Sequence, residues 1–166
     1  MLVGIIADTH GSLPRAAYNE LADCDHIVHA GDIGGPEILE ELRTLAPVTA
    51  VLGNNDIPEY GELVGRIALE SIGGVRFLVT HTPASLHAAL SGRTSALAPG
   101  DPLPTVAVHG HTHVPRIECG AEAFPARMLL CPGSPVRPRG GSLPSVAKLL
   151  VENGIVVTAR IVELRV

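Results

Sequence analysis

The first third of the chain alternates short apolar runs with helix-forming segments, and this order restricts the folds that the chain can adopt. Residues 2–7 are continuously apolar, as expected of a strand that is buried on both faces. Further strands are predicted over 26–30 and 47–52, and helices over 15–22 and 36–45. Strands that alternate with helices in this way form a parallel sheet through right-handed crossovers.

The rest of the chain has the pattern of an antiparallel half. The turn dipeptide Gly73-Gly74 separates two strand-like segments, and Asn153-Gly154 is the strongest hairpin signal in the chain. A short helix is predicted over 84–90 and a loop over 91–104. The strands predicted in this half cover 66–71, 75–80, 105–109, a segment after Pro115, 128–131, 145–151 and 155–162. We therefore expect two packed sheets with helices on the outside.

The composition is that of one globular domain, and it argues against several classes of partner. At 166 residues, with 46% hydrophobic and 17% charged side chains, the chain is long enough to bury a core. A formal charge of −5 and the lack of a basic run argue against long nucleic acids as partners. No run approaches the roughly 18 apolar residues of a membrane span. Three cysteines without C-x-x-C spacing suit reduced thiols in the cytoplasm.

Polar side chains that bind metals follow five of the predicted strands. The motifs are Asp8-Thr9-His10, Gly31-Asp32, Gly53-Asn54-Asn55-Asp56, His81 and Gly110-His111-Thr112-His113. Each motif alone is common by chance, but ligands bind outside the carboxyl ends of strands in α/β sheets. Together the five motifs predict one site that is assembled from all five strand ends.

In this order the motifs resemble the full set of the calcineurin-like metallophosphoesterases, which is D-x-H, GD, GN-x-D, H and GH-x-H. The sequence is most similar to the small, single-domain bacterial and archaeal phosphodiesterases of that family. The resemblance extends to the CPGS segment at 131–134, where the family has NPGS. It implies the α/β class, a four-layer αββα sandwich of two mixed β-sheets flanked by helices, and a single domain over 1–166.

The resemblance also implies a centre that holds two divalent metal ions. The ligands of the first ion would be Asp8, His10, Asp32 and His113. The ligands of the second ion would be Asp32, which bridges, together with Asn54, His81 and His111. Carboxylate, imidazole and amide ligands suit Mn, the ion we expect, and also Ni, Fe, Co or Zn. The predicted catalytic residues are Asp32, Asn54, Asn55 and Asp56.

The implied function is a phosphodiesterase or phosphatase in which a metal-bridging hydroxide attacks phosphorus. Two divalent ions with Asp8 and Asp32 would make the pocket positive within an acidic protein, which suits a small phosphate ester. Specificity is expected to lie in the loops 56–65 and 91–104. From the resemblance alone we expect a homodimer or a higher homo-oligomer.

The sequence departs from the family pattern at two positions. Many relatives have a histidine after the asparagine of the GN motif, where it acts as general acid, but this chain has Asn55. An amide cannot donate a proton as an acid, so turnover should favour good leaving groups. At the second position Cys131 replaces the family's asparagine, and we expect this to change local hydrogen bonding and not the ligand set.

Two other interpretations of the chain compete with the metal centre. A non-catalytic scaffold or interaction module of the same fold is the main alternative, and the retained ligand set argues against it. Residues 131–137 fit C-x5-R, the spacing of cysteine-dependent phosphatases, but the prolines in this loop remove two of the backbone donors that cradle phosphate. We interpret Arg137 and Arg139 as exposed turn residues, with contact to the substrate as the alternative. We interpret the remaining histidines as strand or surface residues, with contacts of His29 and His109 to ligand-bearing turns as the alternative. These histidines are His26, His29, His87 and His109.

Overall fold

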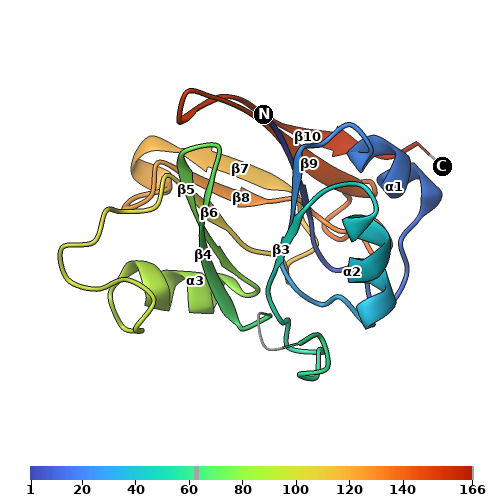
Figure 1. Cartoon of the computed structure of the whole chain (residues 1–166), viewed down its shortest axis with the longest axis horizontal. Helices are drawn as coiled ribbons and strands as arrows, with labels where there is room; N and C mark the ends of the chain where they lie inside the picture. Colours follow the sequence, from blue (N-terminus) through green and yellow to red (C-terminus); the bar gives the residue numbers. More distant parts are fainter. Residues whose placement is uncertain (62–63, 166) are drawn as a thin grey trace.

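The computed structural model describes residues 1–61 and 64–165, and its strands form two mixed five-stranded sheets that pack face to face (Figure 1). The first sheet has the order β10-β9-β1-β2-β3, with β1 (Leu2–Ile6), β2 (His26–His29), β3 (Val48–Ala50), β9 (Ser145–Glu152) and β10 (Ile155–Glu163). The second has the order β4-β5-β6-β8-β7, with β4 (Ile67–Ile72), β5 (Val75–Thr80), β6 (Val106–Val108), β7 (Arg116–Cys119) and β8 (Met128–Cys131).

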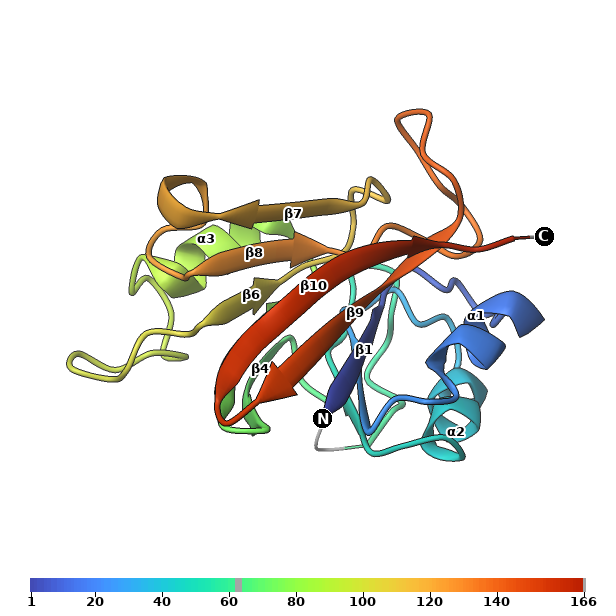
Figure 2. The ribbon, with the colours of Figure 1, turned by 90° about the horizontal axis from the view of Figure 1, so that it is seen from above.

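Within the described residues, three α-helices cover the outer faces of the two sheets. They are α1 (Arg15–Leu21), α2 (Pro36–Arg43) and α3 (Pro83–Leu90), and a short 3-10 helix spans Gly120–Glu122. Helices α1 and α2 lie beside the first sheet, and α3 lies beside the second (Figures 1 and 2). The predicted α/β class and the four-layer αββα arrangement are therefore confirmed.

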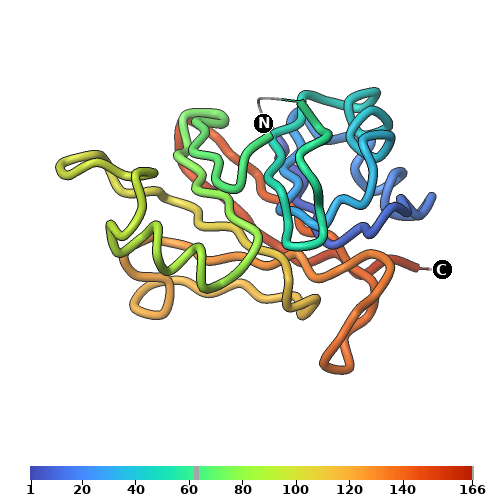
Figure 3. The backbone as a smooth tube through the Cα atoms, turned by 90° about the horizontal axis from the view of Figure 1, so that it is seen from below, coloured from blue at the N-terminus to red at the C-terminus, as the bar shows by residue number. Residues whose placement is uncertain are grey.

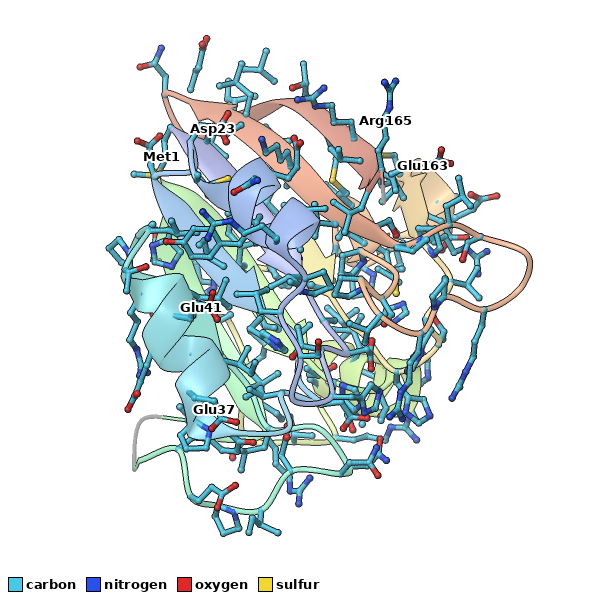
Figure 4. All side chains as sticks on the ribbon, turned by 90° about the vertical axis from the view of Figure 1, so that its right-hand side faces the viewer. Met1, Asp23, Glu37, Glu41, Glu163 and Arg165 are labelled. Atoms are coloured by element: carbon cyan, nitrogen blue, oxygen red, sulfur yellow. The ribbon has the colours of Figure 1, made fainter. Side chains whose placement is uncertain are left out.

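Each boundary between layers is filled by aliphatic side chains. The central cluster joins the facing sides of both sheets and includes Val28 and Val108, while separate clusters lie under α1 and α2 and under α3. Helix α2 shows how the pattern of the sequence places it. Leu39 is buried against the first sheet, whereas Glu37 and Glu41 lie on the outer face of the helix (Figure 4).

The predicted antiparallel second half is only partly correct. Strands β4 and β5 form the expected hairpin, and β9 and β10 form the second hairpin around Asn153-Gly154. Both residues of that turn have positive φ, as a two-residue turn of this kind requires. However, β5, β6 and β8 pair in parallel. The physical reason is that α3 and long connections carry the chain back across the sheet between these strands, as parallel pairing requires.

The parallel strands of each sheet bring their carboxyl ends to one edge of the sandwich. Strands β1, β2 and β3 are parallel in the first sheet, and β5 and β6 are parallel in the second. The turns that follow these five strands carry all the predicted ligands, and the backbone trace in Figure 3 shows these turns converging. Residues 62–63 of the predicted specificity loop 56–65 lie outside the described residues. Within the described chain, no helix is long and apolar enough to span a bilayer.

Candidate metal centre

The backbone is strained at most of the predicted ligands. Among the described residues, six non-glycine residues have positive φ, and five of them are predicted metal ligands. These five, with φ between 46° and 66°, are Asp8, His10, Asp32, His111 and His113. The left-handed region is costly for residues with a Cβ, and such strain concentrates at functional sites. The strained backbone of the turns after β1, β2 and β6 therefore orients the candidate ligand side chains, at the cost of a less favourable backbone conformation.

Asp8, His10 and His113 form a first cluster of candidate ligands. Asp8 is fully buried at the end of β1, and its Oδ1 lies 3.3 Å from Nε2 of His113. Nε2 of His10 lies 3.4 Å from Nε2 of His113 and 3.9 Å from Oδ2 of Asp32. The Asp8 carboxylate is held in place by the backbone N–H of His111, whose nitrogen is 3.0 Å from Oδ2.

Asn54, His81 and His111 form a second cluster, which meets the first at the two aspartates. Nε2 of His81 lies 3.4 Å from Oδ1 of Asp32 and 3.9 Å from Oδ1 of Asp8. Oδ1 of Asn54 lies 3.0 Å from Nε2 of His81 and 2.9 Å from Nδ1 of His111. The structure thus brings all seven predicted ligands together, with Asp32 between the two clusters.

In His81 and His113, the ring tautomer places the lone pair of Nε2 opposite carboxylate oxygens, which are themselves hydrogen-bond acceptors. Nδ1 of His81 lies 2.8 Å from the carbonyl oxygen of Ala30, and Nδ1 of His113 lies 2.6 Å from that of Arg137. A carbonyl oxygen only accepts, so both Nδ1 atoms must carry the proton. In a neutral ring, Nε2 then presents a lone pair to the Asp8 and Asp32 carboxylates. Lone pairs that face carboxylate oxygens repel one another, and a metal cation between them removes the repulsion. The donor set therefore fits divalent ions.

The two carboxylates differ in how readily they give up a proton. Burial raises the pKa of Asp8 to about 7. Burial also acts to raise the pKa of Asp32, but hydrogen bonds from His81 and Asn55 outweigh it and hold that pKa well below its usual range. The same contact with Asp32 overcomes the effect of burial on His81 and raises its pKa. Protonation of His81 is thus one way to supply positive charge, and bound metal is the other.

Asn55 and Asp56 fix the turn after β3 to the turn after β2. The backbone N–H of Asn55 donates to Oδ1 of Asp32 over 3.0 Å, and its side-chain amide donates to Oδ2 over 2.6 Å. The buried Asp56 carboxylate accepts bonds of 2.8–3.1 Å from Ile33 N, Gly34 N, Gly53 N and Tyr60 Oη. Asp56 was predicted to be catalytic, but its oxygens are engaged within the protein, so its contacts orient the turn after β3.

The comparison with known families agrees with this geometry. A family model described as the calcineurin-like phosphoesterase superfamily domain matches residues 1–154. The chain belongs to this superfamily. It is also 36% identical over 164 residues to a protein named probable metallophosphoesterase from Methanocaldococcus jannaschii, and the match covers 92% of this chain and 77% of that protein.

Two solved structures share the fold of this chain. An archaeal phosphodiesterase superposes with a TM-score of 0.73 at 24% identity, covering 98% of this chain and 100% of that one. Vps29 of Entamoeba histolytica in complex with zinc superposes with a TM-score of 0.69 at 17% identity, covering 97% of each chain. At these identities the likeness is one of fold.

Cys131, the second departure from the calcineurin-like pattern, is fully buried behind the ligand-bearing turn after β6. Its Sγ lies 3.4 Å from Oγ1 of Thr112 and 3.9 Å from the carbonyl oxygen of Gly110. Burial raises the pKa of the thiol, which disfavours the thiolate that a cysteine-dependent phosphatase needs. Cys131 therefore packs beneath the candidate metal ligands of the turn after β6 and is not presented to a substrate.

Sequence reasoning missed a buried link between the turns after β1 and β2. The backbone N–H of Gly31 donates to Nδ1 of His29 over 3.2 Å, so the ring proton is on Nε2. Nε2 donates to Oγ1 of Thr9 over 2.9 Å, and the Thr9 hydroxyl donates to the carbonyl oxygen of Ile33 over 2.9 Å. A contact of this kind is the alternative, and not the preferred, interpretation of His29 from the sequence, and Thr9 has no role assigned from the sequence. Its position between two predicted ligands was the available signal.

Ser134 was also missed as a positioning residue. Its hydroxyl donates to the carbonyl oxygen of Asp8 over 2.8 Å and accepts from the backbone N–H of Arg137 over 3.0 Å. The serine of the CPGS segment thus ties the turn after β1 to the loop after β8. The family's NPGS pattern pointed to this segment, but not to the bond.

We expect acid to destabilise the fold through His29. Burial lowers the pKa of this histidine from 6.5 to about 4, so the folded protein resists a proton that the unfolded chain accepts. Stability is therefore fully present above pH 6.5 and is lost as the pH falls towards 4, by about 3 kcal/mol at most. Urea unfolding of the chelator-treated protein should show this slope, and His29→Gln should flatten it.

The exposed His87→Gln provides the control, because it should keep the slope of the parent protein. The raised pKa of Asp8 acts in the opposite direction, since the folded state then binds its proton more readily. The contribution of Asp8 to the pH dependence of stability is the same in the parent protein and in both variants. It therefore cancels when their slopes are compared. Equal slopes for the parent protein and His29→Gln would contradict the role of His29.

Proposed function

We propose that this calcineurin-like protein is a metal-dependent phosphodiesterase whose centre holds two divalent ions, with manganese as the native metal and the cytoplasm as its location. The observation that carries the proposal is the convergence of the first and second clusters on Asp8 and Asp32, with imidazole lone pairs facing carboxylates. When bound, two such ions activate a water and polarise the phosphoryl oxygens. The shared fold of an archaeal phosphodiesterase supports the proposal.

The protein's own groups orient this chemistry. Asp32 receives two hydrogen bonds from Asn55 and faces histidines of both clusters, so its carboxylate is aimed before any ligand arrives. Oδ1 of Asn54 lies within 3.0 Å of Nε2 of His81 and 2.9 Å of Nδ1 of His111. Side chains that are fixed in advance need little reorganisation during the reaction, which is the main source of electrostatic catalysis.

A substrate and metal panel tests the proposal. The diester bis(p-nitrophenyl) phosphate and the monoester p-nitrophenyl phosphate are assayed with Mn, Ni, Co, Zn and Mg after treatment with a chelator. We expect turnover of the diester to vanish with the chelator, to return with Mn, and to exceed turnover of the monoester. Activity that survives the chelator, or a preference for the monoester, would contradict the proposal.

We expect the rate to depend strongly on the leaving group, because Asn55 provides no acid. Its amide donates to Oδ2 of Asp32 over 2.6 Å and cannot supply a proton to a departing oxygen. Removing general acid catalysis costs about 10²–10⁴-fold, and the cost falls on poor leaving groups. Aryl diesters should therefore be hydrolysed at least about 10²-fold faster than matched alkyl diesters. Asn55→His should reduce the difference between the aryl and alkyl rates. Equal rates for the two diesters in the parent protein would contradict the prediction.

A scaffold of the same fold is the second candidate, and the structural likeness to Vps29 is the observation that favours it. The two readings differ in what the metal-loaded protein does. A phosphodiesterase turns over the aryl diester in proportion to bound metal. A scaffold leaves it intact at every metal loading, and that result would replace the first proposal by the second.

A further inference from the structure

The loop between β8 and β9 is tied to the first cluster and projects from the body of the protein (Figures 2 and 3). The carbonyl oxygen of Arg137 accepts the Nδ1 proton of His113 over 2.6 Å, and the backbone N–H of Arg139 donates to the carbonyl oxygen of His113 over 3.2 Å. The Ser134 hydroxyl holds the start of the same loop to Asp8. The backbone of both arginines is therefore hydrogen-bonded directly to His113, a candidate metal ligand.

Both guanidinium groups are exposed and lack a carboxylate partner within the part of the chain that the structure describes. The ion pairs of arginine there belong to Arg76 and Arg116, and none involves Arg137 or Arg139. Pro138 separates the two arginines and restricts the backbone between them. Two unpaired cations on a restrained loop are suited to bind an anion, because the restrained backbone loses little entropy when the anion binds.

The positive charges of the two arginines affect the pKa values of residues in the first cluster. Arg137 contributes to lowering the pKa of His10, which burial lowers most. Arg139 likewise acts to lower the pKa of Asp8 and of His113, in each case as a smaller influence than burial. These effects and the backbone contacts agree that the loop flanks the first cluster.

The proposed centre has no need of these charges for a simple diester. Two divalent ions with two carboxylates leave about two positive charges, which a hydroxide and one diester monoanion neutralise. The arginines then add positive charge beside a centre that is already balanced. We propose that Arg137 and Arg139 bind a second anionic group of the substrate, so that the substrate is a phosphodiester with a further negative charge. This inference rests on the proposed function.

Binding of two stable ligands that differ by one phosphate tests it without turnover. Thymidine 5′-monophosphate and thymidine 3′,5′-bisphosphate are titrated calorimetrically into the Mn-loaded protein, and bound Mn is measured for every variant. We expect the bisphosphate to bind at least about tenfold more tightly than the monophosphate. The double variant R137Q/R139Q should bind the two ligands equally while it keeps its metal.

Arg127→Gln is the matched control, because this exposed arginine precedes β8 at the end of the strand remote from Cys131. It should keep the preference of the parent protein. A parent protein without the preference, or a double variant that retains it, would overturn the inference. Failure of the proposed function gives a different result. The protein would then hydrolyse no diester but would still prefer the bisphosphate.

Discussion

Asp32→Asn is expected to lower phosphodiesterase activity by at least about 10³-fold, the upper end of the loss seen when one charge-stabilising group is removed. The carboxylate lies between the two clusters, with Oδ1 3.4 Å from Nε2 of His81 and Oδ2 3.9 Å from Nε2 of His10. Asparagine keeps the shape and the hydrogen bond from the backbone of Asn55 but removes the negative charge. Metal affinity should therefore fall together with activity, while the fold is retained.

Asp25→Asn provides a control with the same chemical change. Asp25 is exposed, precedes β2 and accepts from the backbone N–H of Leu2 at the edge of the sandwich remote from the metal centre. Bound metal, the rate of diester hydrolysis and the thermal midpoint are measured for both variants. Full activity or full metal occupancy in Asp32→Asn would show that Asp32 does not bridge the centre.

Gly53→Ala is the second substitution from which we expect a large effect. A Cβ at this position would overlap Oδ1 and the backbone nitrogen of Asp32, because the turns after β2 and β3 are in contact here. Asp32 cannot move freely, since Asn55 and the turn after β2 hold it. We expect a loss of about 1–3 kcal/mol in unfolding free energy from overpacking and a fall of about 10²-fold in activity from misplacement of Asp32.

Gly65→Ala separates the steric effect from the general effect of adding a methyl group. Among the residues that the structure describes, a Cβ at Gly65 would meet only the carbonyl oxygen of Ile67, at 3.8 Å, and neither glycine has positive φ. Denaturant unfolding and diester hydrolysis are compared for the two variants. If Gly53→Ala and Gly65→Ala behaved alike, the close packing of the two turns would not be what positions Asp32.

The layers of the fold could be predicted because the apolar runs are strong and well separated. Residues 2–7 contain β1, and α2 lies within the helix predicted over 36–45. The direction of pairing in the second sheet was harder to predict. Periodicity identifies a strand but does not name its neighbour, and β6 and β8 are short. The helix α3 between β5 and β6 was the overlooked sign of a parallel crossover.

The candidate metal ligands could be predicted because Asp, Asn and His residues follow the strands directly, and α/β sheets bind small molecules and ions at the carboxyl ends of their strands. Their left-handed backbone could not be predicted, because His10, His111 and His113 have no intrinsic preference for positive φ strong enough to be read from sequence. Contacts between distant residues were equally hidden. The bond from Ser134 to the carbonyl oxygen of Asp8 joins residues 126 positions apart, and only the assembled fold reveals it.

Anomalous diffraction from manganese-soaked crystals tests the dinuclear centre most directly. We predict two anomalous peaks about 3.5–4 Å apart. One peak should lie beside the first cluster and the other beside the second, with the Asp32 carboxylate between them. A single peak, or none within reach of Asp32, in crystals that contain bound manganese elsewhere would contradict a two-metal centre.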